Sequence, residues 1–159
     1  MLVGSAVRTQ EASFSSLHTF LAWDHRRLSA VLLDVDREVG AGDLPRALRT
    51  FSHYQRGVRR HIHLEEETVF QLYANDRTGA ARSPKAVLEA DHAEILKCVA
   101  EMGAALEVRD IAGFRAAAQH LGRIAPDHHK LEEEILCPYI DALLGPVEAQ
   151  SLIARLRAE

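Results

Sequence analysis

Apolar side chains recur every three or four residues along most of the chain, with polar residues between them. Leu17, Leu21, Leu28, Leu32 and Val35 show this spacing, which places them on one face of an α-helix. Three later stretches repeat the pattern, and none alternates apolar and polar residues as a strand would. The pattern predicts helices over about 11–39, 44–74, 84–108 and 111–143, with a short helix over 147–158.

Turn-forming residues separate the predicted helices. They lie at 40–43, at 75–84 around Gly79, and at 109–110, and Asp43, Ser83 and Asp110 are candidate N-caps. Connections this short make successive helices antiparallel. We therefore expect an all-α fold, an up-down-up-down four-helix bundle over the single domain 1–159. The short C-terminal helix would cover one end.

Composition narrows the functional classes. The 159 residues suffice for one domain, and the net charge of −4 supplies no overall positive field for nucleic acid. No apolar run approaches the roughly 20 residues of a membrane span. Two isolated cysteines suit a reducing compartment. We expect a cytoplasmic protein that binds neither nucleic acid nor membrane, and the oligomeric state stays open.

Nine histidines are many for a chain of this length, and several of them belong to an internal repeat. A shift of 67 residues superimposes the two halves of the chain, mainly at ionisable positions. The matching pairs are His25 with His92, His61 with His128, Glu65–Glu67 with Glu132–Glu134, and Asp43 with Asp110.

Six of these ionisable groups are expected to meet inside the bundle. The midpoints between successive histidines fall in the predicted turns, so the four imidazoles lie at one height. In each His-x-x-x-Glu segment both side chains lie on one helix face. Burying carboxylates without partners is costly, so a metal is the simplest explanation. The predicted ligands are His25, His61, Glu65, His92, His128 and Glu132.

The number and type of these donors indicate two metal ions. A structural zinc site uses four ligands, commonly with cysteine, whereas imidazole and carboxylate suit iron. Two octahedral ions offer twelve positions, of which four imidazoles and two bridging carboxylates fill eight. An oxo or hydroxo bridge fills two more, leaving about two for small molecules. A terminal or chelating carboxylate would change this count.

The two segments HIHLEEETVF, from His61, and HHKLEEEILCP, from His128, with His25 and His92, resemble the hemerythrin-like (HHE cation-binding) family. The resemblance covers essentially the whole chain. It implies a non-haem di-iron centre in a four-helix bundle, with two iron ions joined by an oxo or hydroxo bridge and held by the six residues above. Ferritin-like proteins need two Glu-x-x-His motifs, and only Glu89-Ala-Asp-His92 has that form.

One position departs from the oxygen-carrying members of that family, which have a fifth histidine where this chain has Leu96. This favours sensing, storage or detoxification over oxygen transport. The expected partner is a small ligand such as dioxygen, nitric oxide or peroxide. A redox enzyme acting on peroxide or nitric oxide, and an iron-handling or iron-centre repair protein, remain alternatives.

Several residues near the predicted ligands are assigned to packing or to solvent. Tyr54 and Tyr139 are expected in the core, and Pro126 and Pro138 could kink the fourth helix. The polar residues expected on exposed faces are Asp24, Arg56, Arg59, Arg60, His63, Glu66, Asp91, His129 and Glu133, and a carboxylate beside the site, Glu66 or Glu133, could instead shuttle protons. His53 and His120 are expected on the polar face or beside the predicted ligands, and not as ligands themselves.

Overall fold

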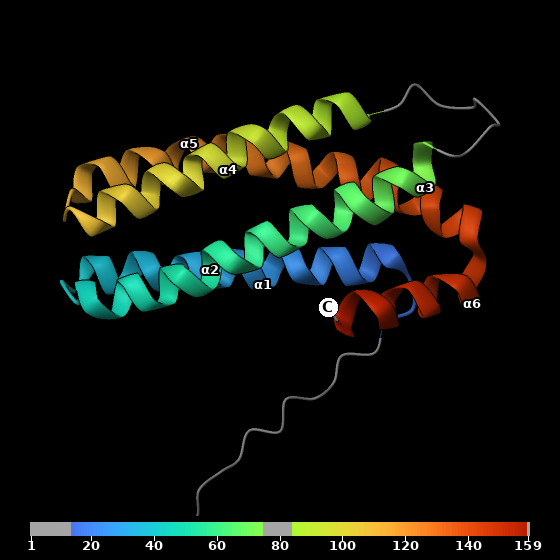
Figure 1. Cartoon of the computed structure of the whole chain (residues 1–159), viewed down its shortest axis with the longest axis horizontal. Helices are drawn as coiled ribbons and strands as arrows, with labels where there is room; N and C mark the ends of the chain where they lie inside the picture. The colour runs from blue at the N-terminus through green and yellow to red at the C-terminus, as the bar shows by residue number, and fades with distance from the viewer. Residues whose placement is uncertain (1–13, 75–83, 159) are drawn as a thin grey trace, which may run out of the picture.

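The computed structural model describes residues 14–74 and 84–158, and within these ranges the chain is almost entirely helical without strands. Two antiparallel hairpins pack into a four-helix bundle, as Figure 1 shows, which confirms the predicted fold class. The elements are α1 (Leu17–Gly40), α2 (Leu44–Leu64), η1 (Glu65–Val69), α3 (Phe70–Ala74), α4 (Lys85–Glu107), α5 (Ile111–Leu131), η2 (Glu132–Leu136) and α6 (Cys137–Ala158).

Side-chain caps begin three of the bundle helices. Ser16 forms a capping box with Thr19 at the start of α1. Asp43 accepts a hydrogen bond from the backbone N–H of Arg46, and Asp110 accepts one from that of Gly113. These two caps were predicted; Ser83, the third candidate, lies outside the described residues.

The C-terminal helix is separated from the bundle by a single glycine. Gly145 has φ 77° and ψ 170°, a conformation that interrupts α6 and that glycine adopts without strain. The segment after it packs Leu152 and Leu156 against Leu17 in one apolar cluster. The C-terminal helix therefore covers one end of the bundle, as expected.

Apolar residues form two separate clusters along the bundle. One lies toward the α1–α2 and α4–α5 turns and includes Phe51, Met102 and Phe114. The other lies near the C-terminal helix and includes Phe20 and Phe70. On every bundle helix the predicted histidine ligand lies near the point in sequence where one cluster gives way to the other, so apolar residues flank these polar groups.

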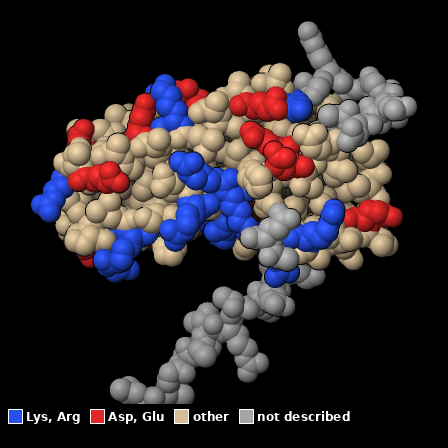
Figure 2. Space-filling view, in the orientation of Figure 1, with Lys and Arg blue, Asp and Glu red and all other residues tan. Residues whose placement is uncertain are grey.

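The Lys and Arg residues of the described ranges lie on the outside of the bundle. Figure 2 shows Lys and Arg side chains gathered on the face that α2 presents, where Arg56, Arg59 and Arg60 are exposed as expected. Arg60 also donates a hydrogen bond to the backbone carbonyl of Leu156. No helix in the described ranges is long and apolar enough to cross a membrane.

Candidate metal centre

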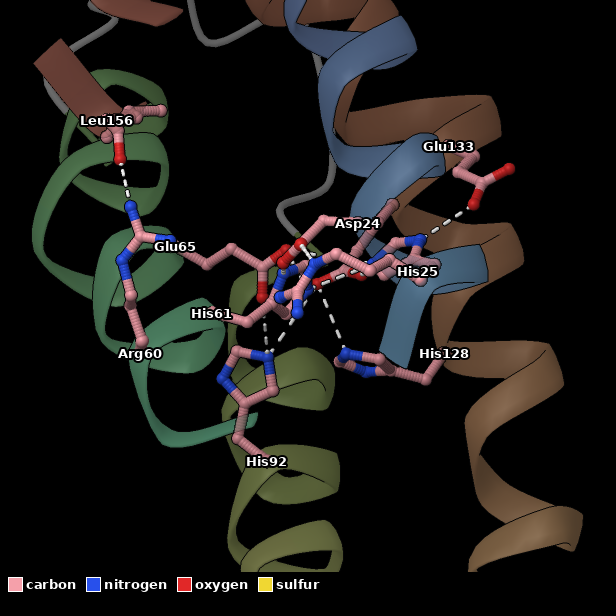
Figure 3. A network of polar contacts seen from close by, with 11 residues as sticks. Asp24, His25, Arg60, His61, Glu65, His92, His128, Glu133 and Leu156 are labelled. Carbon is pink, nitrogen blue, oxygen red and sulfur yellow. Dashed lines mark hydrogen bonds and ion pairs between the residues drawn. The ribbon is translucent and has the colours of Figure 1, made fainter. Parts of the chain in front are cut away.

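The six predicted ligands converge in the interior of the bundle. His25, His61, His92 and His128 come one each from α1, α2, α4 and α5, and all are buried. Glu65 and Glu132 are the first residues of η1 and η2, and both are 0 % exposed. Figure 3 shows the four imidazoles pointing toward one another around the carboxylates.

The donor atoms form two groups that share both carboxylates. In the first, His61 Nε2 lies 3.0 Å from Glu65 Oε1, and His25 Nε2 lies 3.2 Å from Glu132 Oε2. In the second, His92 Nε2 lies 3.2 Å from Glu65 Oε2, and His128 Nε2 lies 3.2 Å from Glu132 Oε1. Within each group the donor atoms lie within 4.8 Å of one another. The arrangement offers two adjacent positions for cations.

A carboxylate on a neighbouring helix contacts the Nδ1 atom of His61 and of His128. Asp24 Oδ2 lies 2.9 Å from Nδ1 of His61, and Asp91 Oδ2 lies 3.4 Å from Nδ1 of His128. The exposed placement expected for both aspartates was wrong, because Asp24 is 5 % exposed and Asp91 is half-buried. Each contacts a ring on the adjacent helix, and not that of the histidine that follows it in sequence.

The other two imidazoles are held in the same way by glutamates. Glu66 Oε1 lies 2.9 Å from Nδ1 of His92, and Glu133 Oε1 lies 2.7 Å from Nδ1 of His25. Both glutamates were expected to be solvated; they are only partly exposed and reach across to another helix. A carboxylate on Nδ1 orients the ring and leaves Nε2 facing the centre, as in many metal sites.

The donor set fits metal ions better than it fits a closed network of hydrogen bonds. Neither carboxylate of Glu65 and Glu132 has a hydrogen-bond partner of good geometry in the described chain. His25 Nε2 and His61 Nε2 lie 3.0 Å apart, although both rings direct Nδ1 to a carboxylate. Two facing lone pairs repel unless a proton or a cation lies between them. A cation at each group would satisfy all of these atoms.

The buried carboxylates of the centre favour positive charge on the groups around them, as the pKa values of these groups indicate. Burial lowers the pKa of His61, but Glu65 and Asp24 outweigh it and raise that pKa to about 10. Burial also lowers the pKa of His92, but contacts with Glu132 and Glu65 outweigh it and raise that pKa to about 10. Burial raises the pKa of Asp24, but hydrogen bonds from His61 and Arg27 outweigh it and lower that pKa to about 2. The cluster therefore binds protons wherever it lacks another cation.

Glu65 and Glu132 each begin a single turn of π-helix. The backbone N–H of Phe70 bonds to the carbonyl of Glu65, and that of Cys137 bonds to the carbonyl of Glu132, each five residues apart. Such turns are rare and are found frequently at functional sites. The apolar spacing did not reveal them, because the inserted residue changes the phase of the stripe only for the residues that follow each glutamate, as the 50 % exposure of Ile135 shows.

The position predicted for His129 was also wrong. It was expected to be exposed, but it is half-buried and its ring stacks on that of His25 with 3.8 Å between centroids. Burial, followed by the charge of His25, lowers the pKa of His129 to about 3. His129 is thus a neutral ring beside the centre. His63, by contrast, is exposed as expected.

Other candidate residues lie outside the centre. His53 is exposed, and His120 Nε2 lies 3.7 Å from Glu94. Position 96 supplies no fifth imidazole, because it is a leucine, and its side chain packs partly buried against the apolar cluster that contains Phe51. Tyr54 is buried as expected, whereas Tyr139 is half-buried and its ring lies 5.0 Å from that of Tyr73.

Comparison with known proteins identifies the family. No curated protein and no solved structure matches this chain. The family model of the hemerythrin HHE cation binding domain matches residues 17–140, which include all six predicted ligands. With the bundle and the two His/Glu groups, this match establishes that the chain belongs to the hemerythrin HHE cation-binding family, whose members bind metal.

Proposed function

We propose that this protein holds two iron ions and binds dioxygen or a related small ligand, such as nitric oxide or peroxide, for sensing, storage or detoxification. The six residues that would hold the ions are His25, His61, Glu65, His92, His128 and Glu132. The arrangement that supports this proposal is the pair of fully buried carboxylates, each facing imidazole nitrogens from both halves of the chain.

The chemistry of the donors supports iron. All six offer nitrogen or oxygen, and neither cysteine belongs to either group of the centre. Two iron ions would supply reversible redox chemistry and open coordination positions for a small ligand. The protein supplies orientation through four Nδ1 contacts with carboxylates, and apolar clusters flank the centre on both sides.

Metal analysis tests the proposal. Protein prepared with iron should contain about two ions per chain, and its absorption spectrum should change when oxygen or nitric oxide is added. Glu132→Gln should reduce the iron content, because this side chain contributes to both groups. His63→Ala is the matched control, since His63 is exposed. Iron-free protein, or equal iron in Glu132→Gln and His63→Ala, would refute the assignment.

A redox enzyme is the second candidate, and the two partly exposed glutamates favour it. Glu66 and Glu133 connect buried imidazoles to the surface, so each can relay protons between solvent and the centre. Turnover of peroxide or nitric oxide by iron-loaded protein tests this function. Glu66→Gln and Glu133→Gln should then lower turnover more than they lower iron content. Activity no greater than that of free iron would exclude it.

A further inference from the structure

A cavity of about 590 Å³ lies in the bundle on one side of the metal centre. At one end its walls include His25, His61 and His128, and along α1 it extends to Asp36. His25 and Asp36 are eleven residues apart, or about 16 Å along a helix. Between these ends the lining is mostly apolar, with Leu28, Leu32, Ala118, Leu121 and Ala125 among its residues.

The internal repeat explains why the cavity lies on this side. A shift of 67 residues places α2 on α5, and it pairs Phe51 with Ala118 and Val58 with Ala125. Phe51 closes the corresponding space between α2 and α4, since a Cβ added at Gly103 would meet its ring at 3.1 Å. The residue equivalent to Gly103 is Asp36, which lines the cavity.

Helix packing agrees with this difference in side-chain size. Helices α1 and α5 contact each other much less than α2 and α4 do, and α1 meets the fourth bundle helix again at η2 and α6. On α5, a Cβ added at Gly122 would meet no heavy atom within 4 Å. The space is therefore built by small side chains on α5.

The cavity is partly open to solvent, since Leu33 and Asp36 among its lining residues are exposed. Its mostly apolar walls give the water inside few hydrogen bonds. An apolar cavity of about 150 Å³ accommodates benzene, and this one is about four times larger. It greatly exceeds what dioxygen or nitric oxide needs, and it matches the size and lining of small-molecule sites.

We propose that this cavity binds an uncharged aliphatic molecule, such as a medium-chain alcohol, with one end beside the metal centre. Its elongated, apolar shape suits a chain. No Lys or Arg is among the described residues that line it, and Asp36 disfavours an anionic end. The role of this molecule as a substrate or regulator of the centre rests on the proposed function, whereas the binding itself does not.

Calorimetric titration of the iron-loaded protein with 1-octanol tests the proposal. Binding should be measurable, with a negative heat-capacity change that reports burial of apolar surface. The double variant Ala118→Phe/Ala125→Val copies the residues of α2 into the cavity and should weaken binding at least about tenfold. Gly122→Leu is a second, independent filling variant. Ala112→Val/Ala116→Val, on the exposed face of α5, is the control and should bind like the unmodified protein.

Three outcomes would overturn the proposal. One is the absence of octanol binding by protein that contains iron. Another is equal binding by the two filling variants and the control, with thermal unfolding showing that all are folded. The third is a dimer that the filling variants dissociate, because a second copy would then cover the space. Iron measured on the same samples separates these results from failure of the di-iron assignment.

Discussion

The two halves of the chain agree in their polar chemistry and differ in their apolar packing. Under the 67-residue shift, the helices α2 and α5, the turns η1 and η2, and their aspartate caps superimpose residue for residue. The contacts that hold the imidazoles also correspond: Asp24 to His61 matches Asp91 to His128. Each half therefore supplies an equivalent set of predicted ligands and of side chains that contact their Nδ1 atoms.

The apolar positions of the same helices do not correspond. Under the shift, Phe51 and Val58 of α2 correspond to Ala118 and Ala125 of α5. Ile62 likewise corresponds to His129. Phe51 fills the space between α2 and α4, whereas residues of α1 and α5 form most of the lining of the cavity. The imidazoles of the two halves keep the same arrangement although the core side chains beside them differ greatly in volume. Carboxylate contacts between helices position the rings independently of that packing.

Removal of one ligand histidine from each half tests their equivalence most strongly. His61→Ala and His128→Ala each damage a different group of donors, so each variant should retain about one metal ion per chain. The double variant should retain none. Elemental analysis measures this, with His53→Ala as the control outside the centre. Loss of both ions in one single variant and of neither in the other would show that the halves are not equivalent.

The pH dependence of the metal-free protein tests whether both halves contribute charge. His61 and His92 have pKa values raised from 6.5 to about 10, so their protons stabilise the fold below pH 6.5, and this contribution is lost toward pH 10. The pKa of Glu132 lies well below 4.5, owing to contacts with His128 and His25 that outweigh its burial, so its contribution disappears in acid.

Thermal unfolding of chelated protein should therefore show greatest stability between about pH 4.5 and 6.5. His61→Gln should reduce the loss of stability above pH 6.5, since one of the two raised groups is then absent. Stability that stays constant or rises from pH 6.5 to pH 10 would contradict the charge balance described for the centre.

The two aspartates that orient imidazoles should differ in importance. Asp24 is nearly buried and lies 2.9 Å from His61, whereas Asp91 is half-buried and lies 3.4 Å from His128. Loss of such a contact typically weakens metal binding about 10- to 100-fold. Asp24→Asn should fall in this range and Asp91→Asn below it, as competition with a metal-binding dye would show. An equal loss would mean that burial does not matter here.

Removal of a helix cap should have the smallest effect, and the loss of stability should be nearly the same in the two halves. Asp43→Ala and Asp110→Ala each remove one side-chain hydrogen bond from a helix N-terminus. Each should lower the free energy of unfolding by about 1 kcal/mol. Urea unfolding measures this, and Asp34→Ala, at an exposed position inside α1, is the control. A difference well above 1 kcal/mol would show that the turns are not equivalent.

The bundle could be predicted from the sequence because apolar spacing, turn residues and caps all agreed. The six inward groups followed from spacing within a helix and distance from a turn, both of which are local properties. The Nδ1 contacts of Asp24, Glu66 and Glu133 depend on how each helix is rotated toward its neighbour, which periodicity alone defines only coarsely. The repeat did carry a signal, since Asp24 recurs after 67 positions as Asp91, and Glu66 recurs as Glu133.

The cavity could not be predicted, although its cause is visible in the sequence. A small residue such as Ala118 is compatible with either a closer approach of two helices or an open space. Which of these occurs depends on the whole interface, in which α1 contacts η2 and α6 as well as α5. His129 was misplaced for a related reason, because the space beside α1 admits its ring.

The π-helical turns also determine the phase of everything that follows them. Each inserts one residue, so the helix beyond it is rotated by about 100° relative to an uninterrupted α-helix. That rotation brings Phe70 and Tyr73 inward after the first turn, and Cys137 and Ile140 inward after the second. Shortening either turn by one residue would swing these side chains out of the core, so the metal centre and the far apolar cluster share one helical register.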